Sequence, residues 1–320
     1  MEDTRLEGLI NYFLSNRHVE AGRIILESYE DLKEAPEAMF IFANMMDCGL
    51  GNLHVDERLA FQLTSQAAYQ ECPYAAAELL RLMAEERTYN YRLAPARSRP
   101  KSNDLYEWCT ETLKNLEPLV AKGDSLANRQ YLSIYHHAPM ADGAQITAEN
   151  ILKEMYRQKD PAAPILRAWS YVNSRTRMDH DIANDLLPQL EASFFAGEHE
   201  AAHLHTWVSR NFSEDADQDR SLELLSQSAE AGVVGSMHLF ADACTNRLKN
   251  PEMRRLAIKW FAKAARRGCV DSMFRLGLSL DPNSEYCIIP NEDTAMRWYE
   301  RAALKRHPEA LFYLECPGTG

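Results

Sequence analysis

Apolar positions recur along most of the chain at spacings of three and four residues, in segments that come in pairs. One first segment has its apolar residues at Ala257, Trp260, Phe261, Ala264 and Ala265. This spacing places them on one face of a helix. Beyond a short turn, residues 273–277 continue an apolar stripe on a second helix, and the alternating pattern of strands is scarce throughout. The pattern predicts an all-α chain built from helix pairs.

The helix pairs repeat at a nearly constant interval. Aligning the segments places the turn between the two helices of successive pairs at Glu71, Gly123, Lys159, Gly197, Gly232, Gly268 and Arg306. From Gly123 onward the intervals are 35 to 38 residues, and the longer first interval is explained by a Pro- and Arg-containing insert at 90–104. One such pair cannot cover its own apolar face, so stacked pairs are the stable solution. We expect a right-handed α-α superhelix, a solenoid of about seven to eight helix-pair repeats.

The best repeats resemble a known family. The unit at 257–277 has Ala257, an aromatic pair at 260–261, an Ala pair at 264–265, the turn Gly268 and a closing Leu-Gly at 276–277. The same order recurs from Ala295, and the segment from residue 43 carries a Gly-x-Gly loop, Gly49 and Gly51. In these features the chain resembles the Sel-one-like repeats, relatives of the tetratricopeptide repeats. The resemblance implies a non-catalytic scaffold that binds another protein or peptide, usually in bacteria for a chain of this length.

The resemblance also divides the sequence. We expect one solenoid over 1–320, with N-terminal repeats at 1–89, a loop insert at 90–104, degenerate repeats at 105–216 and well-matched repeats at 217–315. In the degenerate part the aromatic pair and most glycines are missing. The insert is either a contact site or a tolerated insertion, since long loops serve both purposes.

Composition narrows the choice of partners. The chain is 46% hydrophobic and 26% charged, which is typical of a globular protein, and its net charge is −12. An acidic chain does not favour nucleic acid or an anionic membrane, because both need a cationic surface. The seven cysteines are odd in number and form no C-x-x-C, and the first residues do not read as a secretory signal. We expect a cytoplasmic protein with reduced thiols and no cofactor.

An H-E-x-x-H motif, His199, Glu200 and His203, raises the alternative of a zinc-dependent hydrolase. In the repeat register these residues begin the second helix after Gly197, so the two histidines share a helix face. Zinc catalysis also needs a third protein ligand and an open coordination position. No H-E-x-x-H-x-x-G-x-x-H extension follows. The motif is therefore interpreted as part of a repeat helix, with no metal and no catalysis.

Cations gather on the polar faces of the first helices in the last two repeats. The candidate partner-binding residues are Arg255, Lys259, Arg266, Arg297 and Arg301. A basic groove suits an acidic peptide or a C-terminal carboxylate, although an ordinary amphipathic surface gives the same pattern. The tryptophans of these helices, Trp260 and Trp298, occupy a repeated slot and are expected in the core. The leading hypothesis is an adaptor that binds a partner in its superhelical groove, and the alternative within the same class is an immunity-type protein that neutralises a toxin by direct binding.

Overall fold

The computed structural model describes residues 2–84, 105–137, 144–173, 178–212, 218–246 and 250–315, and every regular element in these ranges is an α-helix. The predicted fold class, an all-α array of repeated helix pairs, is confirmed. The insert at 90–104 lies outside the described residues. None of the described helices is both long enough and apolar enough to cross a bilayer.

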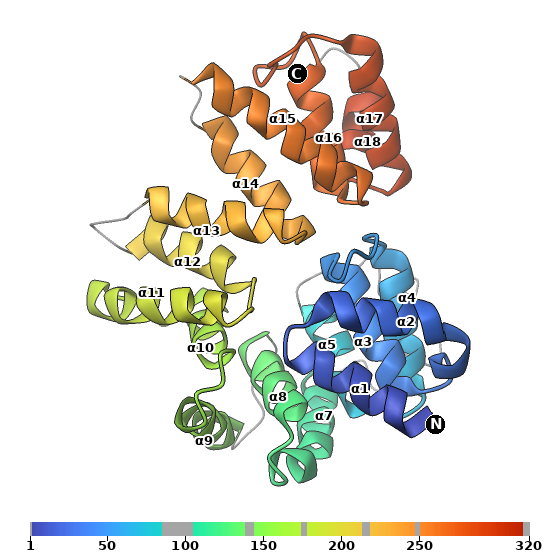
Figure 1. Cartoon of the computed structure of the whole chain (residues 1–320), viewed down its shortest axis with the longest axis vertical. Coiled ribbons are helices and arrows are strands. Elements are labelled where there is room, and N and C mark those ends of the chain that lie inside the picture. Colours follow the sequence, from blue (N-terminus) through green and yellow to red (C-terminus); the bar gives the residue numbers. More distant parts are fainter. Residues whose placement is uncertain are drawn as a thin grey trace. The chain divides into compact units, whose positions relative to one another are not determined.

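The helices follow one another in antiparallel pairs (Figure 1). Three helices open the chain: α1 (Glu2–Leu14), α2 (His18–Leu32) and α3 (Pro36–Cys48). The pairs that follow are α4 (Glu57–Tyr69) with α5 (Pro73–Ala84), α7 (Leu105–Val120) with α8 (Ser125–His137), α9 (Ala144–Arg157) with α10 (Ala163–Asn173), α11 (His180–Phe195) with α12 (Ala201–Phe212), α13 (Gln218–Glu230) with α14 (Val234–Asn246), α15 (Pro251–Arg266) with α16 (Val270–Leu280), and α17 (Glu292–Leu304) with α18 (Pro308–Glu315).

The turn between the two helices is the same structure in every pair. Its central residue has a positive φ at each position that the sequence marks as the turn: Glu71, Gly123, Lys159, Gly197, Gly232, Gly268 and Arg306. At Gly268 the turn residue donates to Ala265 O at 3.1 Å, and Cys269 donates to Ala264 O at 3.1 Å. These two bonds define a Schellman motif, which satisfies the last carbonyls of the first helix. The repeat register is therefore confirmed, and Asn16, with φ 58°, adds one such turn between α1 and α2.

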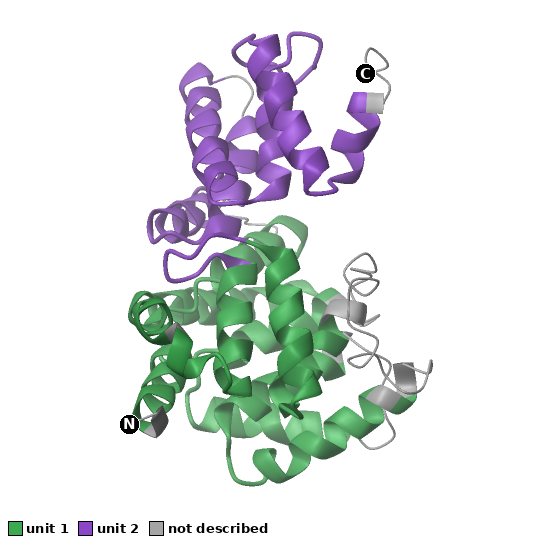
Figure 2. Ribbon diagram, turned by 90° about the vertical axis from the view of Figure 1, so that its right-hand side faces the viewer, with its two compact units in different colours: residues 1–47, 56–217 green, residues 48–55, 218–320 purple. Residues whose placement is uncertain are grey.

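The chain forms two compact units (Figure 2). The first comprises residues 1–47 and 56–217, and the second comprises residues 48–55 and 218–320. The main boundary coincides with the start of the well-matched repeats at 217. The short Gly-x-Gly loop at 48–55 belongs to the second unit although the helices beside it in sequence belong to the first, a feature that the repeat pattern does not indicate.

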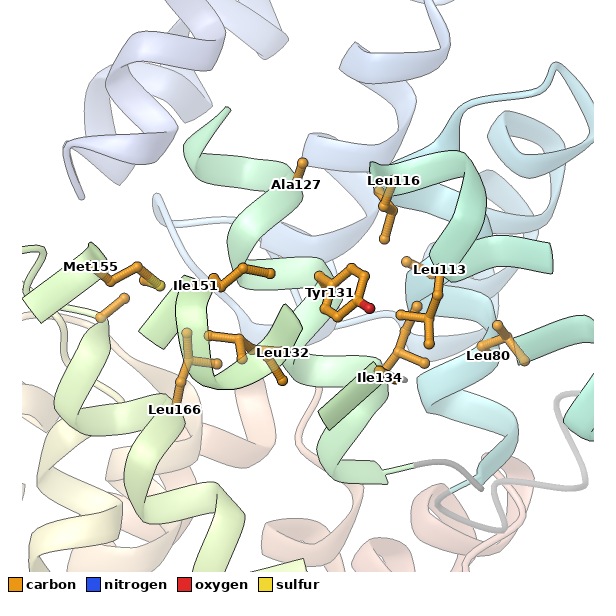
Figure 3. Close-up of a cluster of buried hydrophobic side chains, with 14 of the residues drawn as sticks. Leu80, Leu113, Leu116, Ala127, Tyr131, Leu132, Ile134, Ile151, Met155 and Leu166 are labelled. Carbon is orange, nitrogen blue, oxygen red and sulfur yellow. The ribbon is translucent and has the colours of Figure 1, made fainter. Parts of the chain in front are cut away.

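An apolar cluster lies in the first unit where consecutive pairs meet. Buried side chains from α5, α7, α8, α9 and α10 form one cluster around Tyr131, which is 1% exposed (Figure 3). Each pair thus contributes to a core shared with its neighbours, as expected for a repeat array. The stability of this unit depends on contacts between pairs as well as within them.

Small residues let the helices of the second unit approach closely. A Cβ at Gly277 of α16 would lie 2.4 Å from Cε1 of Tyr299 on α17, so glycine is the residue that fits there. Ala264 and Ala265 of α15 are also buried. These are the positions at which the sequence repeats small residues.

The loop at 48–55 is bound into the second unit by one arginine. The guanidinium of Arg267 donates to the carbonyls of Gly232 at 2.6 Å, Gly49 at 3.0 Å and Leu53 at 2.8 Å. The backbone of Val55 donates in return to Arg267 O at 2.7 Å. Burial lowers the pKa of Arg267, which forms no ion pair with any described residue. Arg267 therefore donates hydrogen bonds to backbone carbonyls that lie outside the regular helices.

Candidate functional site

The H-E-x-x-H motif spans a turn and a helix. Helix α12 begins at Ala201, so His199 and Glu200 precede it and only His203 is helical. The sequence prediction that all three residues begin the second helix is therefore wrong at its first two positions. After the Schellman turn at Gly197, single-turn bonds such as Ala201 N to Glu198 O at 3.0 Å continue the chain before regular helical bonding starts. His199 and His203 consequently do not have the fixed spacing of a zinc-binding helix.

Other side chains hold the residues of this motif. The indole Nε1 of Trp169 donates to Oε1 of Glu200 at 2.8 Å, and the His199 ring contacts Phe194 edge-on at 5.6 Å between centroids. Glu200 has surface accessible to solvent, and desolvation by the surrounding protein raises the pKa of its carboxyl. Among the described residues no three His, Cys, Asp or Glu side chains are arranged to hold a metal ion.

An ion-pair network beside the motif connects successive repeats of the first unit. Arg129 of α8 contacts Asp160 at 3.2 Å and Glu198 at 3.0 Å, the acidic residues that directly follow the turn residues of the next two pairs. His18 lies close to this network, and its pKa falls to about 4 because of burial and the neighbouring His199 and Arg129. Since Arg129 pairs with carboxylates of two other repeats, this arrangement is that of a structural contact.

The predicted basic residues all lie on the surface of the second unit. Arg255, Lys259 and Arg266 are exposed on α15, and Arg297 and Arg301 are exposed on α17. We call these five residues the basic face. Helix α15 packs mainly against α14 and α16, and α17 packs against α16 and α18, so both helices of the basic face pack against α16.

The two tryptophans behind the basic face differ. Trp260 is 6% exposed and its ring meets Phe240 edge-on at 5.9 Å, which confirms that this residue is in the core. Trp298 is only partly buried, so the prediction of a second core tryptophan is wrong. Each tryptophan carries a cation three residues later over its ring, Lys263 at 3.9 Å and Arg301 at 4.7 Å from the centroid. These cation–π contacts hold two cations in defined positions on α15 and α17.

A cleft opens in the first unit, and none of the predicted site residues lines it. Its volume is about 1020 Å³, and α9, α10 and α11 with the α9–α10 turn form its walls. Tyr156, Arg167 and Gln189 are among the lining residues. The cleft falls within the degenerate repeats.

Comparison with known proteins finds similarity to one family over part of the chain. The family model of the Sel1 repeat matches residues 36–72, 213–233, 248–269 and 270–307. A Sel1 repeat protein from Oxalobacter formigenes is 21% identical, with a TM-score of 0.48, over 98% of this chain and 89% of that chain. A protective antigen present in uropathogenic Escherichia coli strains, displaying an SLR fold, is 16% identical, with a TM-score of 0.49, over 98% of this chain and 65% of that one.

A comparison with curated proteins gives no match. The matches of the family model include the N-terminal Gly-x-Gly loop and lie otherwise in the C-terminal repeats. None of them falls within residues 73–212. This is the segment in which the sequence pattern degenerates. Within the matched segments the chain is therefore similar to Sel1-repeat proteins.

Proposed function

We propose that this chain is a non-catalytic adaptor that binds a partner protein or peptide through the basic face of its second unit. Sel1 repeats generally mediate contacts between proteins, and the basic face supplies a specific surface for such a contact. The proposal rests on one observation. No described residue forms an ion pair or a hydrogen bond with the side chain of Arg255, Lys259, Arg266 or Arg297.

Several arginines elsewhere on the molecule are paired. Surface arginines form ion pairs at a spacing of three residues, as in Arg17 with Glu20, Arg157 with Glu154 and Arg220 with Glu223. In a chain with a net charge of −12, carboxylates are abundant enough to supply such partners. A group of unpaired cations therefore creates a local positive potential that attracts an anionic partner.

The chemistry of the basic face favours an acidic partner segment or a C-terminal carboxylate. Arginine binds a carboxylate through two parallel hydrogen bonds, and Arg301 is already held in place over the ring of Trp298. The half-buried Trp298 offers an apolar surface next to these cations. An acidic segment with a neighbouring apolar side chain would satisfy both features.

The test compares the full-length chain with the double variant Lys259→Glu, Arg297→Glu. Affinity capture from cells of the source organism and mass spectrometry identify candidate partners, and binding of the purified partner is then measured at several salt concentrations. We expect affinity that falls with salt and is lost in the double variant, while the helical spectrum and melting temperature stay unchanged. A captured toxin that the chain inactivates would identify the immunity-type alternative.

The control is the double variant Lys114→Glu, Lys122→Glu, which makes the same change in charge at two exposed lysines of the first unit. This variant should bind the partner nearly as well as the unmodified chain, because its substitutions lie outside the basic face. Equal affinity of the basic-face variant and the unmodified chain would exclude this surface as the binding site.

A further inference from the structure

Three residues of the degenerate repeats break the pattern at slots that are buried in a well-matched repeat. The slot eight residues before the turn is Trp260 in the Gly268 repeat and Gln189 in the Gly197 repeat. The slot three residues before the turn is Ala265 in the Gly268 repeat and Tyr156 in the Lys159 repeat. The slot eight residues after the turn is Leu276 in the Gly268 repeat and Arg167 in the Lys159 repeat. The three replaced slots are 6%, 2% and 2% exposed in the well-matched repeat. At each slot a side chain with polar atoms stands where the repeat places an apolar one.

All three replacements meet at the same cleft. Tyr156 comes from α9, Arg167 from α10 and Gln189 from α11, and the cleft of about 1020 Å³ lies between these helices. Helix α10 packs against both α9 and α11 and lies between them (Figure 1). In the well-matched repeat this slot holds the small, buried Ala265, whereas here it holds the larger Tyr156, which lines the cleft.

Two polar atoms of this cleft have no partner within the protein. Tyr156 Oη and Gln189 Oε1 are buried and form no hydrogen bond with any described residue. Burial raises the pKa of Tyr156 and the nearby Arg167 guanidinium opposes this rise, yet the two groups do not meet in hydrogen-bond geometry. The amide of Gln189 is fixed because its Nε2 donates to Asp185 O at 3.0 Å, which leaves Oε1 as an acceptor. Unpaired buried groups reduce stability unless a ligand or water completes them.

The charges around the cleft favour a carboxylate. Lys153 and Lys159 line it and form no ion pair with any described residue, and Arg167 uses one nitrogen to contact Asp185 at 2.7 Å. Two carboxylates also line the cleft: Asp160 pairs with Arg129, and Glu149 accepts from Gln145 Nε2 at 3.0 Å. Apolar walls complete the cleft at Leu152, Pro161, Pro164 and Tyr171. A ligand for this site therefore combines an anionic group, an apolar side chain and a hydrogen-bond donor.

We propose that the cleft between α9, α10 and α11 binds an acidic peptide segment of a partner protein. A backbone N–H of the peptide donates to Gln189 Oε1, and a peptide carboxylate accepts from Tyr156 Oη and contacts Arg167 with Lys153 or Lys159. An apolar side chain packs on the prolines and Tyr171. The volume of the cleft is at the upper end of the range of small-molecule pockets, about 300–1,000 Å³. This matches several residues of an extended chain. The site is separate from the basic face and does not depend on it.

The test uses a phage-displayed library of random peptides, selected on the immobilised full-length chain. Enriched peptides are synthesised with a fluorescent label, and their affinity is measured by anisotropy for the unmodified chain and for Arg167→Leu and Tyr156→Phe. We expect acidic peptides whose affinity falls by about tenfold in Arg167→Leu, since this variant removes a charge-assisted contact.

The Tyr156→Phe variant separates binding from folding. It removes only the unpartnered hydroxyl, so its melting temperature should stay equal or rise while its affinity for the peptide falls. A purely structural tyrosine would not give this combination. Hydrogen exchange should in addition show protection by the peptide within residues 149–196.

The double variant Lys259→Glu, Arg297→Glu serves as the reciprocal control and should keep its affinity for the selected peptides. The proposal would be overturned if the selection enriched no peptide that binds the unmodified chain better than the Arg167→Leu chain. It would also be overturned if the selected peptides bound all variants with equal affinity. Peptides whose binding is lost only in the basic-face variant would overturn the cleft site and leave the proposed function standing. Each outcome thus assigns the binding surface.

Discussion

The Schellman turns offer a matched pair of substitutions, Gly123→Ala and Gly268→Ala. Both glycines have positive φ, 76° and 102°, in the same turn of two different repeats. At Gly123 no atom lies within 4 Å of an added Cβ. At Gly268 the Cβ would lie 2.2 Å from the backbone oxygen of Val55 and 2.6 Å from the His54 ring. The two substitutions therefore share the backbone strain and differ in the contact with the loop at 48–55.

The difference in stability between the two variants follows from the hydrogen bonds that each substitution weakens. An alanine at positive φ costs about 1–2 kcal/mol, which is the whole expected effect at Gly123. At Gly268 the backbone of the loop has to move, because a backbone oxygen cannot turn aside like a flexible side chain. This movement weakens three hydrogen bonds between Arg267 and the loop. Val55 N donates one of them to Arg267 O, and the Arg267 guanidinium donates the other two to the carbonyls of Gly49 and Leu53. At about 0.5–1.5 kcal/mol each, these bonds raise the expected cost to roughly 3–6 kcal/mol.

Urea unfolding followed by far-UV circular dichroism measures both variants, with each transition fitted separately because the chain has two compact units. Hydrogen exchange at the Val55 amide gives a local readout, and it should accelerate in Gly268→Ala alone. If the two variants lost equal stability and the exchange of residues 49–55 did not change, the loop would not be held by the Gly268 turn, and the reasoning would be refuted.

Four further expectations can be checked on the same material. Trp260→Ala should lose about 3–5 kcal/mol in urea unfolding as a large-to-small core substitution, and Trp298→Ala, in the same slot but partly exposed, should lose clearly less; equal losses would contradict the difference in burial. The pKa of His18 is lowered from 6.5 to about 4, so the neutral imidazole favours the folded state above pH 6.5, and this contribution should be lost as the pH falls from 6.5 to 4. In a His18→Asn chain the melting temperature should therefore depend less on pH in that range. Metal analysis should find no stoichiometric zinc, and zinc that is lost in His203→Ala would instead support the hydrolase alternative. Deleting 293–320 should leave a helical but less stable protein, because each pair contacts mainly its neighbours, and loss of all helicity would contradict the repeat model.

The sequence determined the helices and the turns between them. Apolar spacing marks the buried faces, and the interval between turns located all seven predicted positions, including Glu71, Lys159 and Arg306, which are not glycines. A helix face and a Schellman turn depend on residues within a few positions of one another, so a local pattern is enough to specify them. The sequence erred at the start of α12, where the repeat register does not reveal the extra single-turn bonds after Gly197.

Only the tertiary structure decided which distant residues meet. Arg267 looks like one more cation of a basic helix, yet it binds carbonyls at Gly49 and Leu53, more than 200 residues away along the chain. Gln189, Tyr156 and Arg167 are visible in the sequence as departures from the repeat, but nothing local indicates that they line one cleft. Trp298 shares its slot with Trp260 and is nevertheless partly exposed, because burial depends on what packs over a residue as well as on its helix face. Periodicity specifies which side of a helix is buried, whereas contacts between distant segments depend on the shapes and charges of both surfaces.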